Sequence, residues 1–288
     1  MLNLCDIKRI KNLLNKHQFK FSKSLGQNFI IDPEICPKMA ELCSENENSG
    51  ILEIGPGIGV LTVQLAKRFE KVVSVEIDKR LIPILSETVS EFENVKVINN
   101  DILEINLNKI IEEEFSDCTE VNVCANLPYY ITSEIIMYIL ENNPGFKSIT
   151  VMVQKEAAER ICALPGTRQS GAISMAVRYY GVPKILFNVN RNCFVPSPNV
   201  DSCVIKIEMK DDNRQGIKNS KNFFKIIRAA YSKRRKNLLN SLSMGLNISK
   251  ESVKEILEKC EINCNLRAEQ LKFEEFVNIS NLFSDLGF

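Results

Sequence analysis

The chain has 288 residues, with 37 Lys and Arg, 36 Asp and Glu, one His and no Trp. Its hydrophobic share of 44% and charged share of 25% are those of a globular protein, and they exclude disordered and collagen-like classes. No apolar run approaches the roughly 18–20 residues of a membrane span, and the N-terminus lacks the features of a signal peptide. We therefore expect a cytoplasmic protein of one large or two smaller domains, with no membrane partner.

The ten cysteines show no metal-binding spacing. They contain no Cys-x-x-Cys pair, and the single histidine, His17, has no partner at zinc-finger spacing. The closest pair, Cys260 and Cys264, lies on an expected helix. We interpret the cysteines as buried, reduced thiols and expect no metal. The lone histidine also excludes most chemistry that uses histidine as an acid, a base or a ligand.

From about residue 50, short apolar runs alternate with amphipathic stretches. The runs lie near 51–54, 72–76, 95–99, 121–125, 149–153, 184–190 and 200–209. Helical spacing recurs near 60–69, 79–90, 104–115 and 132–141. Strands that alternate with helices imply parallel pairing through crossovers, so this pattern predicts a doubly wound α/β sheet. The last two runs are expected to form a closing pair with at least one antiparallel partner.

The two ends of the chain differ from this middle part. Residues 1–24 form a basic arm with six Lys or Arg against one Asp. Residues 211–216 are polar and turn-like, and beyond them helical spacing recurs near 221–241, 250–259 and 268–284 without a clear strand. We predict three parts: the arm 1–24, an α/β domain of residues 25–210, and a small helical domain of residues 211–288.

A glycine-rich loop, Glu53-Ile54-Gly55-Pro56-Gly57-Ile58-Gly59, follows the first strand and opens a helix. Glycines let the backbone approach a ligand in such a turn, although the same turn also occurs in α/β proteins that bind no nucleotide. The next strand ends at Glu76, about 20 residues further on, where an acid accepts hydrogen bonds from ribose hydroxyls. The third strand ends near Asp101. Two acids at neighbouring strand ends favour a ligand that contains adenosine.

The spacing of the loop separates two such ligands. The pyrophosphate of NAD prefers Gly-x-Gly-x-x-Gly at a helix N-terminus, whereas this loop reads Gly-x-Gly-x-Gly after an acidic residue. No basic residue lies near the loop to neutralise a phosphate. S-adenosylmethionine carries adenosine without phosphate, and its cationic sulfonium suits an acidic pocket. The residues favour the methyl donor, and an NAD-dependent dehydrogenase remains the alternative.

The fourth strand ends in the turn Asn126-Leu127-Pro128-Tyr129-Tyr130. Asn and Pro are ordinary turn residues, so the segment has a purely structural interpretation. It also matches what a methyltransferase of an exocyclic amine requires. The Asn126 oxygen and a backbone carbonyl near Leu127 would accept both N–H bonds of an adenine amine, and Tyr129 would stack on the base. The reaction needs no strong proton-accepting side chain. The adenine must leave its base stack to enter the site.

With these motifs the chain resembles the ribosomal RNA adenine dimethyltransferase family, in particular its bacterial small-subunit (KsgA-type) enzymes. The resemblance covers nearly the whole chain from about Ser22, and the ordered set of motifs is very specific. Besides the glycine loop and Asn126-Leu127-Pro128-Tyr129, the motifs are Ser24-Leu25-Gly26-Gln27-Asn28-Phe29, Val75-Glu76-Ile77-Asp78, Phe194-Val195-Pro196-Ser197-Pro198-Asn199-Val200-Asp201-Ser202 and Arg228-Ala229-Ala230-Tyr231-Ser232-Lys233-Arg234-Arg235-Lys236-Asn237-Leu238.

The resemblance implies roles for individual residues. Glu76 would bind the ribose of S-adenosylmethionine, Asp101 its adenine amine, and Phe194 would face Tyr129 across the target base. Core packing is the alternative for Phe194. The residues implied in cofactor binding are Asn28, Ile30, Gly55, Gly57, Glu76, Asp101 and Asn126, and those in catalysis are Asn126, Leu127, Pro128, Tyr129 and Phe194.

The resemblance also implies a seven-strand methyltransferase sheet followed by a helical domain. The implied reaction is N6,N6-dimethylation of two adjacent adenosines in the 3′-terminal hairpin of small-subunit (16S) rRNA, within a 30S precursor. We expect a monomer. Two alternatives stay open besides the dehydrogenase: the family's branch that modifies large-subunit rRNA, and a ribosome-assembly factor without catalysis.

The formal net charge of +1 conceals a strongly basic segment. Residues 214–250 contain ten Lys or Arg and no acid, whereas such charge runs are usually no more than solvated helix faces. A run of one sign over this length favours phosphate contact, and double-stranded RNA is read mainly through its shape and backbone. The candidate RNA-binding residues are Lys221, Lys225, Arg228, Lys233, Arg234, Arg235 and Lys236.

Overall fold

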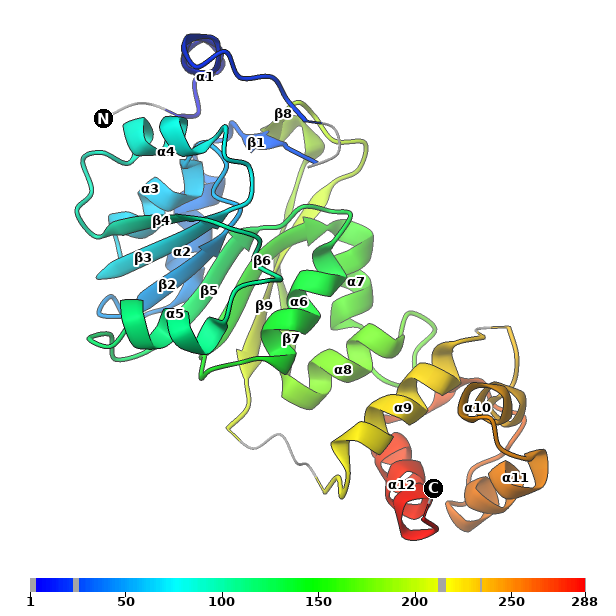
Figure 1. Ribbon diagram of the computed structural model, residues 1–288. Coiled ribbons are helices and arrows are strands. Elements are labelled where there is room, and N and C mark those ends of the chain that lie inside the picture. Colours follow the sequence, from blue (N-terminus) through cyan, green and yellow to red (C-terminus); the bar gives the residue numbers. More distant parts are fainter. Residues whose placement is uncertain (1–3, 23–25, 212–215, 234, 288) are drawn as a thin grey trace. The chain divides into compact units, whose positions relative to one another are not determined.

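The computed structural model describes residues 4–22, 26–211, 216–233 and 235–287 (Figure 1). They divide into two compact units, which we call the sheet unit (residues 1–158 and 184–209) and the helical unit (residues 159–183 and 210–288). Within the described ranges, no helix combines the length and the apolarity that crossing a membrane requires. Three of the residues named above, Ser24, Leu25 and Arg234, lie outside the described residues.

A seven-stranded mixed sheet forms the centre of the sheet unit, in the order β4-β3-β2-β5-β6-β9-β7. Its strands are β2 (Gly50–Ile54), β3 (Lys71–Glu76), β4 (Val95–Asn99), β5 (Val121–Asn126), β6 (Ser148–Gln154), β7 (Gly181–Val189) and β9 (Ser202–Met209). The first five pair in parallel, and β9 pairs antiparallel with β6. The predicted α/β sheet and its antiparallel closing strand are confirmed.

The register of the parallel strands decides where ligands can bind. Ile54 of β2 lies opposite Val75 of β3 and Ala125 of β5, so these strands end at the same level. The residues that follow, Gly55, Glu76 and Asn126, therefore emerge together at one edge of the sheet. In open α/β sheets this carboxyl edge is the usual place for a ligand.

Helices cover both faces of the sheet. Helix α2 packs on β5 and β6 and α3 packs on β3, whereas α5 and α6 lie on the opposite face (Figure 1). The helices that follow or precede the strands are α2 (Ile35–Cys43), α3 (Val60–Ala66), α4 (Ile82–Thr88), α5 (Leu107–Glu114), α6 (Thr132–Glu141) and α7 (Lys155–Cys162). Sequence periodicity predicts α3, α4, α5 and α6 but misses the short helices α2 and α7.

The basic N-terminal arm is part of the sheet unit rather than a separate extension. Helix α1 (Ile7–Lys16) begins at Asp6, whose side chain accepts the amide N–H groups of Lys8 and Arg9. Its residues Ile10, Leu13 and Leu14 are buried in the same apolar core as β1 (Phe29–Ile30), which pairs antiparallel with β8 (Phe194–Val195). The amphipathic spacing of the arm thus reflects docking of α1 on the sheet unit.

The helical unit is built around α9 (Ser220–Tyr231). Its other helices are α8 (Ala172–Tyr180), α10 (Leu238–Leu246), α11 (Lys250–Lys259) and α12 (Phe273–Asp285). The single helix expected near 221–241 is wrong, because Asn237 caps a new helix by accepting the amide N–H of Asn240. The division also differs from the boundary predicted at residue 210: Met175 and Tyr179 of α8 pack in one core with Phe223 of α9, so residues 159–183 join the helical unit.

Candidate active site

A cavity opens at the carboxyl edge of the sheet unit. Counted to its open mouth and including solvent there, its empty space is about 1050 Å³. The seven residues expected to bind the cofactor all line it: Asn28, Ile30, Gly55, Gly57, Glu76, Asp101 and Asn126. Leu127, Pro128 and Tyr129 line it as well. The structure therefore gathers these residues into one site, while their individual roles stay predictions.

The glycine loop forms one wall of the cavity. Gly55 has φ of 65° and Gly57 has φ of 63°, a left-handed conformation in which glycine has no steric penalty. A Cβ atom on Gly57 would also lie 3.2 Å from the Phe29 ring, which closes the loop from the side of the arm. The loop thus requires glycine both for its backbone conformation and, at Gly57, for its close packing against Phe29 of β1.

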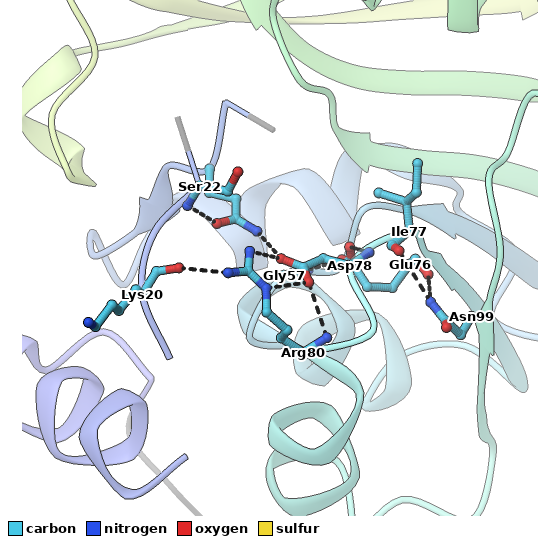
Figure 2. Close-up of polar contacts among 9 residues, drawn as sticks. Lys20, Ser22, Gly57, Glu76, Ile77, Asp78, Arg80 and Asn99 are labelled. Carbon is cyan, nitrogen blue, oxygen red and sulfur yellow. Dashed lines mark hydrogen bonds and ion pairs between the residues drawn. The ribbon is translucent and has the colours of Figure 1, made fainter. Parts of the chain in front are cut away.

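Glu76 is held at the end of β3 by backbone groups. The amide N–H of Asp78 donates to its Oε1 at 2.8 Å, and the amide N–H of Gly57 donates to its Oε2 at 3.2 Å (Figure 2). Burial raises the pKa of Glu76 to about 7, although these N–H groups oppose the shift. Each oxygen can accept a further hydrogen bond, so the carboxylate suits a pair of vicinal hydroxyls.

Glu53 brings a second buried carboxyl to the cavity, which the sequence interpretation did not assign. The residue is 1% exposed, and the Ser74 hydroxyl donates to its Oε2 at 2.7 Å. Its Oε1 is buried without a hydrogen bond of good geometry among the described residues, although the nearby Thr62 hydroxyl still acts to lower the pKa. Burial raises the pKa of Glu53 to about 7, and the nearby Glu76 adds to the shift. A buried acid with no Lys or Arg beside it in the described lining favours a cationic ligand.

The charge of the lining distinguishes between the candidate ligands. Among the described residues that line the cavity, Glu53, Glu76 and Asp101 are acidic and none is Lys or Arg. A pyrophosphate would meet three acids and no counter-charge, whereas an adenosine that bears a cationic sulfonium meets opposite charge. The site therefore fits S-adenosylmethionine and does not fit a nicotinamide dinucleotide.

The turn after β5 presents acceptors to the same cavity. The Asn126 amide donates from Nδ2 to the Asn28 carbonyl at 3.4 Å, which directs Oδ1 away from that contact. The Pro128 carbonyl accepts the Thr132 hydroxyl at 3.0 Å, where α6 begins. The Leu127 amide donates to the Met152 carbonyl of β6 at 3.1 Å. These bonds fix the turn and leave Asn126 Oδ1 and the Leu127 carbonyl as its acceptors.

The aromatic residues of the site differ in their surroundings. The Tyr129 hydroxyl lies 2.6 Å from Ser202 Oγ, and burial raises the pKa of Tyr129, so its hydroxyl stays neutral. Phe194 is 2% exposed, belongs to the apolar core and does not line the cavity. This position accords with the core-packing interpretation of Phe194, and its contact with a target base stays a prediction. Tyr130, which the sequence interpretation did not assign, is 58% exposed at the mouth of the cavity.

A family model described as ribosomal RNA adenine dimethylase matches residues 18–285. The chain belongs to this family. "Ribosomal RNA small subunit methyltransferase A" of Bacillus pumilus is 45% identical over 277 residues, which cover 95% of each chain. A dimethyladenosine transferase from Plasmodium falciparum has a TM-score of 0.74 at 26% identity, over 90% of this chain and 98% of that chain. The 23S rRNA methyltransferase ErmE shares the fold, with a TM-score of 0.67 at 23% identity over 88% and 98%.

The protein, which we refer to as the dimethylase after its family, is thus an rRNA adenine methyltransferase, and its cofactor is S-adenosylmethionine. When bound, this cofactor supplies an electrophilic methyl group. The lining is acidic and its described residues include no Lys or Arg, which agrees with a cationic cofactor that has no phosphate. Glu53 received no role of its own from the sequence, because the residue was treated as part of the glycine motif. Its position directly before the loop is the signal that could have identified it.

The dimethylase carries its predicted RNA-binding residues in the helical unit. Lys221, Lys225 and Arg228 are exposed on one face of α9, at the spacing of successive turns. Lys233, Arg235 and Lys236 are exposed in the turn that follows. Within the described part of the chain, none of these six forms an ion pair with an acid, whereas Lys218 pairs with Asp285 at 2.7 Å. Their charges are therefore available to a polyanion.

The buried Glu53 predicts an unusual pH dependence of stability. Because its pKa is about 7 in the folded state against an ordinary value of 4.5, the folded protein binds the extra proton, and stability falls as pH rises from 5 to 8. Glu53→Gln removes this titration. We expect the unfolding free energy of the variant, relative to wild type, to gain about 3 kcal/mol between pH 5 and pH 8. Urea unfolding of the cofactor-free protein at several pH values measures this difference.

The control is Glu112→Gln, an exposed residue of α5. Its stability curve should run parallel to that of wild type across the same range. Parallel curves for Glu53→Gln and wild type would contradict the buried ionisation.

Proposed function

We propose that the enzyme dimethylates N6 of two adjacent adenosines in the 3′-terminal hairpin of small-subunit (16S) rRNA, within a 30S precursor in the cytoplasm, and that it acts as a monomer. The observation that carries the proposal is that the Asn126 turn shares one cavity with the glycine loop and Glu76. An amine held at the turn and a methyl donor held at the loop would then meet within the same site.

The acids and the loop are assigned to the cofactor. Glu76 accepts hydrogen bonds from the ribose hydroxyls, and Asp101 accepts one from the adenine amine. The buried Glu53 carboxyl adds negative charge near the positively charged end of the donor. The walls are formed by Asn28, Ile30, Gly55 and Gly57. The site needs no metal in this scheme, and no group of three or more His, Cys, Asp or Glu in the described residues is arranged to bind one.

The turn is assigned to the target adenine. Asn126 Oδ1 and the Leu127 carbonyl accept the two N–H bonds of the amine, which turns its lone pair toward the methyl donor. Holding the two reactants in a reactive geometry lowers the activation free energy, because the entropy cost of orienting them is met on binding. The ring of Tyr129 stacks on the extruded base, and its neutral hydroxyl stays bound to Ser202. As the nitrogen–carbon bond forms, the carbon–sulfur bond would break and S-adenosylhomocysteine would leave. The methylated amine would then be cationic and acidic enough to release its proton to water, so no side chain acts as a strong base.

The choice of the small subunit is supported by the relatives. The Bacillus pumilus relative and an Alkaliphilus oremlandii relative, 46% identical over 275 residues, are both small subunit methyltransferases by name. ErmE, which acts on 23S rRNA by name, is more distant at 23% identity and supports the fold alone. The large-subunit branch is therefore the less favoured reading.

The first test is methyl transfer from labelled S-adenosylmethionine to purified ribosomal subunits. We expect incorporation into unmethylated 30S particles at two adjacent adenosines near the 3′ end, and none into 50S precursors. Primer extension across the modified bases maps the product. Label found only in 50S precursors would overturn the proposal in favour of the large-subunit branch.

Two variants separate catalysis from mere binding to the subunit. Asn126→Ala removes one of the two acceptors and is expected to lower the rate of methyl transfer by about 100-fold or more. The matched control is Asn142→Ala at the end of α6, an exposed residue whose side-chain amide donates to the Tyr138 carbonyl at 2.9 Å, and it should keep the wild-type rate. An unchanged rate in Asn126→Ala would refute the role given to this residue.

The basic face of α9 is proposed to bind RNA phosphates. Replacing Lys221, Lys225 and Arg228 together by Gln should weaken binding to 30S particles. The slope of log affinity against log salt is negative and should become less steep by about 2 to 3, because binding with fewer phosphate contacts releases fewer counterions. Filter binding at several salt concentrations measures the slope.

The control for this prediction lies in the same unit. Lys254 and Lys259 on α11 already pair with Glu258 and Glu255, at 3.6 and 2.8 Å. Their replacement by Gln should leave the slope unchanged. Equal slopes for wild type and the α9 variant would exclude this face from the RNA interface.

A further inference from the structure

Asp78 is a buried acid beside the cofactor site that the roles given above do not use. Four donors converge on its two carboxylate oxygens. Arg80 donates to Oδ1 from Nε at 2.9 Å and from its amide N–H at 3.1 Å, and to Oδ2 from Nη2 at 2.6 Å. Gln27 Nε2 donates to Oδ2 at 2.8 Å. A carboxylate that accepts this many bonds, two of them from a guanidinium fork, has a fixed orientation.

On one side, Asp78 is joined to the carboxylate assigned to the ribose. Its amide N–H is the group that donates to Glu76 Oε1, and Asn99 Nδ2 donates to the Glu76 carbonyl at 2.7 Å (Figure 2). The backbone from Glu76 to Asp78 is therefore fixed by side chains at both ends. A shift of Asp78 would move the N–H on which the orientation of Glu76 depends.

On the other side, the two partners of Asp78 hold the N-terminal arm. Gln27 Oε1 accepts the amide N–H of Ser22 at 2.9 Å, and Arg80 Nη1 donates to the Lys20 carbonyl at 3.3 Å (Figure 2). The Arg80 guanidinium also lies 5.1 Å from the centre of the Phe19 ring. Two side chains thus connect one carboxylate to both Phe19–Lys20 and Ser22.

The same stretch of arm packs against residues that line the cavity. Phe19 and Phe21 pack against Phe29, with ring centres 6.3 and 5.3 Å apart. Phe29 in turn closes on Gly57. Gln27 itself lines the cavity together with Asn28, Phe29 and Ile30, whereas Asp78 does not. The docking of residues 19–22 and 26–30 and the shape of the cofactor site are therefore parts of one packed arrangement.

We propose that Asp78, through Gln27 and Arg80, is a positioning residue that couples docking of the N-terminal arm to binding of S-adenosylmethionine at Glu76. The proposal rests on the proposed function in taking Glu76 as the ribose ligand. Because coupling is reciprocal, the cofactor stabilises the docked arm to the same extent that the docked arm strengthens cofactor binding.

The test uses the full-length protein and the product S-adenosylhomocysteine, which carries the same ribose. Calorimetry measures its affinity, and hydrogen exchange of the segment 19–30 is followed with and without it. In wild type, the ligand should slow exchange of this segment. In Gln27→Ala, which loses both bonds of that side chain, we expect about tenfold weaker binding and loss of the ligand-dependent slowing. Steady-state rates should show the KM for S-adenosylmethionine raised about tenfold with kcat within twofold.

Asp78→Asn is the second variant, because it keeps the backbone N–H to Glu76 but replaces one accepting oxygen by a donor. It should reproduce the effects of Gln27→Ala. Glu87→Gln is the matched control: Glu87 also ties the arm to the sheet unit, by accepting from Lys16 at 2.8 Å, but has no bond to Asp78. It should leave both the affinity and the ligand-dependent slowing at wild-type values.

The outcomes are distinct. If Gln27→Ala and Asp78→Asn lose thermal stability but keep the affinity and the ligand-dependent slowing, their role is structural and the coupling is refuted. If Glu87→Gln weakens binding as much as they do, any loosening of the arm suffices and Asp78 has no special part. If wild type itself does not bind S-adenosylhomocysteine, the proposed function fails, and the coupling fails with it.

Discussion

Two buried carboxyls, Glu53 and Glu76, at the ends of adjacent strands are the constraint on which the site depends. Burial raises the pKa of each to about 7, because in the cofactor-free protein their negative charges are poorly solvated. The folded chain contributes N–H groups to Glu76 but no cation to either acid within the described lining. A cationic methyl donor supplies the missing charge, whereas a phosphate ligand would aggravate the imbalance.

The parallel sheet explains why these acids meet the catalytic turn. Strands β2, β3 and β5 are in register at their carboxyl ends, so the glycine loop, Glu76 and Asn126 open into one cavity although they are far apart in the chain. The turn offers acceptors and an aromatic ring rather than a titrating base. Catalysis that relies on orienting the amine requires a rigid turn. The hydrogen bonds of Asn126 with the Asn28 carbonyl and of Leu127 with Met152 of β6 hold the turn in place.

Most of the sheet and most of the site residues could be predicted from the sequence, because they depend on local patterns. The strands follow from short apolar runs, and the site residues follow strand ends, so their meeting at one edge is a consequence of parallel pairing. The contacts of Gln27 with Asp78 had no such signal, since they join residues 51 positions apart through a side-chain bond. Helix α8 was not predicted, and its packing in the helical unit had no local signal, because its partner Phe223 lies far along the chain. The break before Asn237 was readable as a helix cap, but the continuous helical spacing concealed it.

Proton release on cofactor binding tests the central claim most directly. If a cation compensates Glu53 and Glu76, binding of S-adenosylmethionine near pH 7 lowers their pKa values and expels protons. Calorimetry in buffers with different ionisation enthalpies counts these protons, and S-adenosylhomocysteine, whose sulfur is uncharged, is the matched ligand. We predict more proton release for S-adenosylmethionine than for S-adenosylhomocysteine, and a smaller difference in Glu53→Gln. Equal release by the two ligands in wild type would contradict the account.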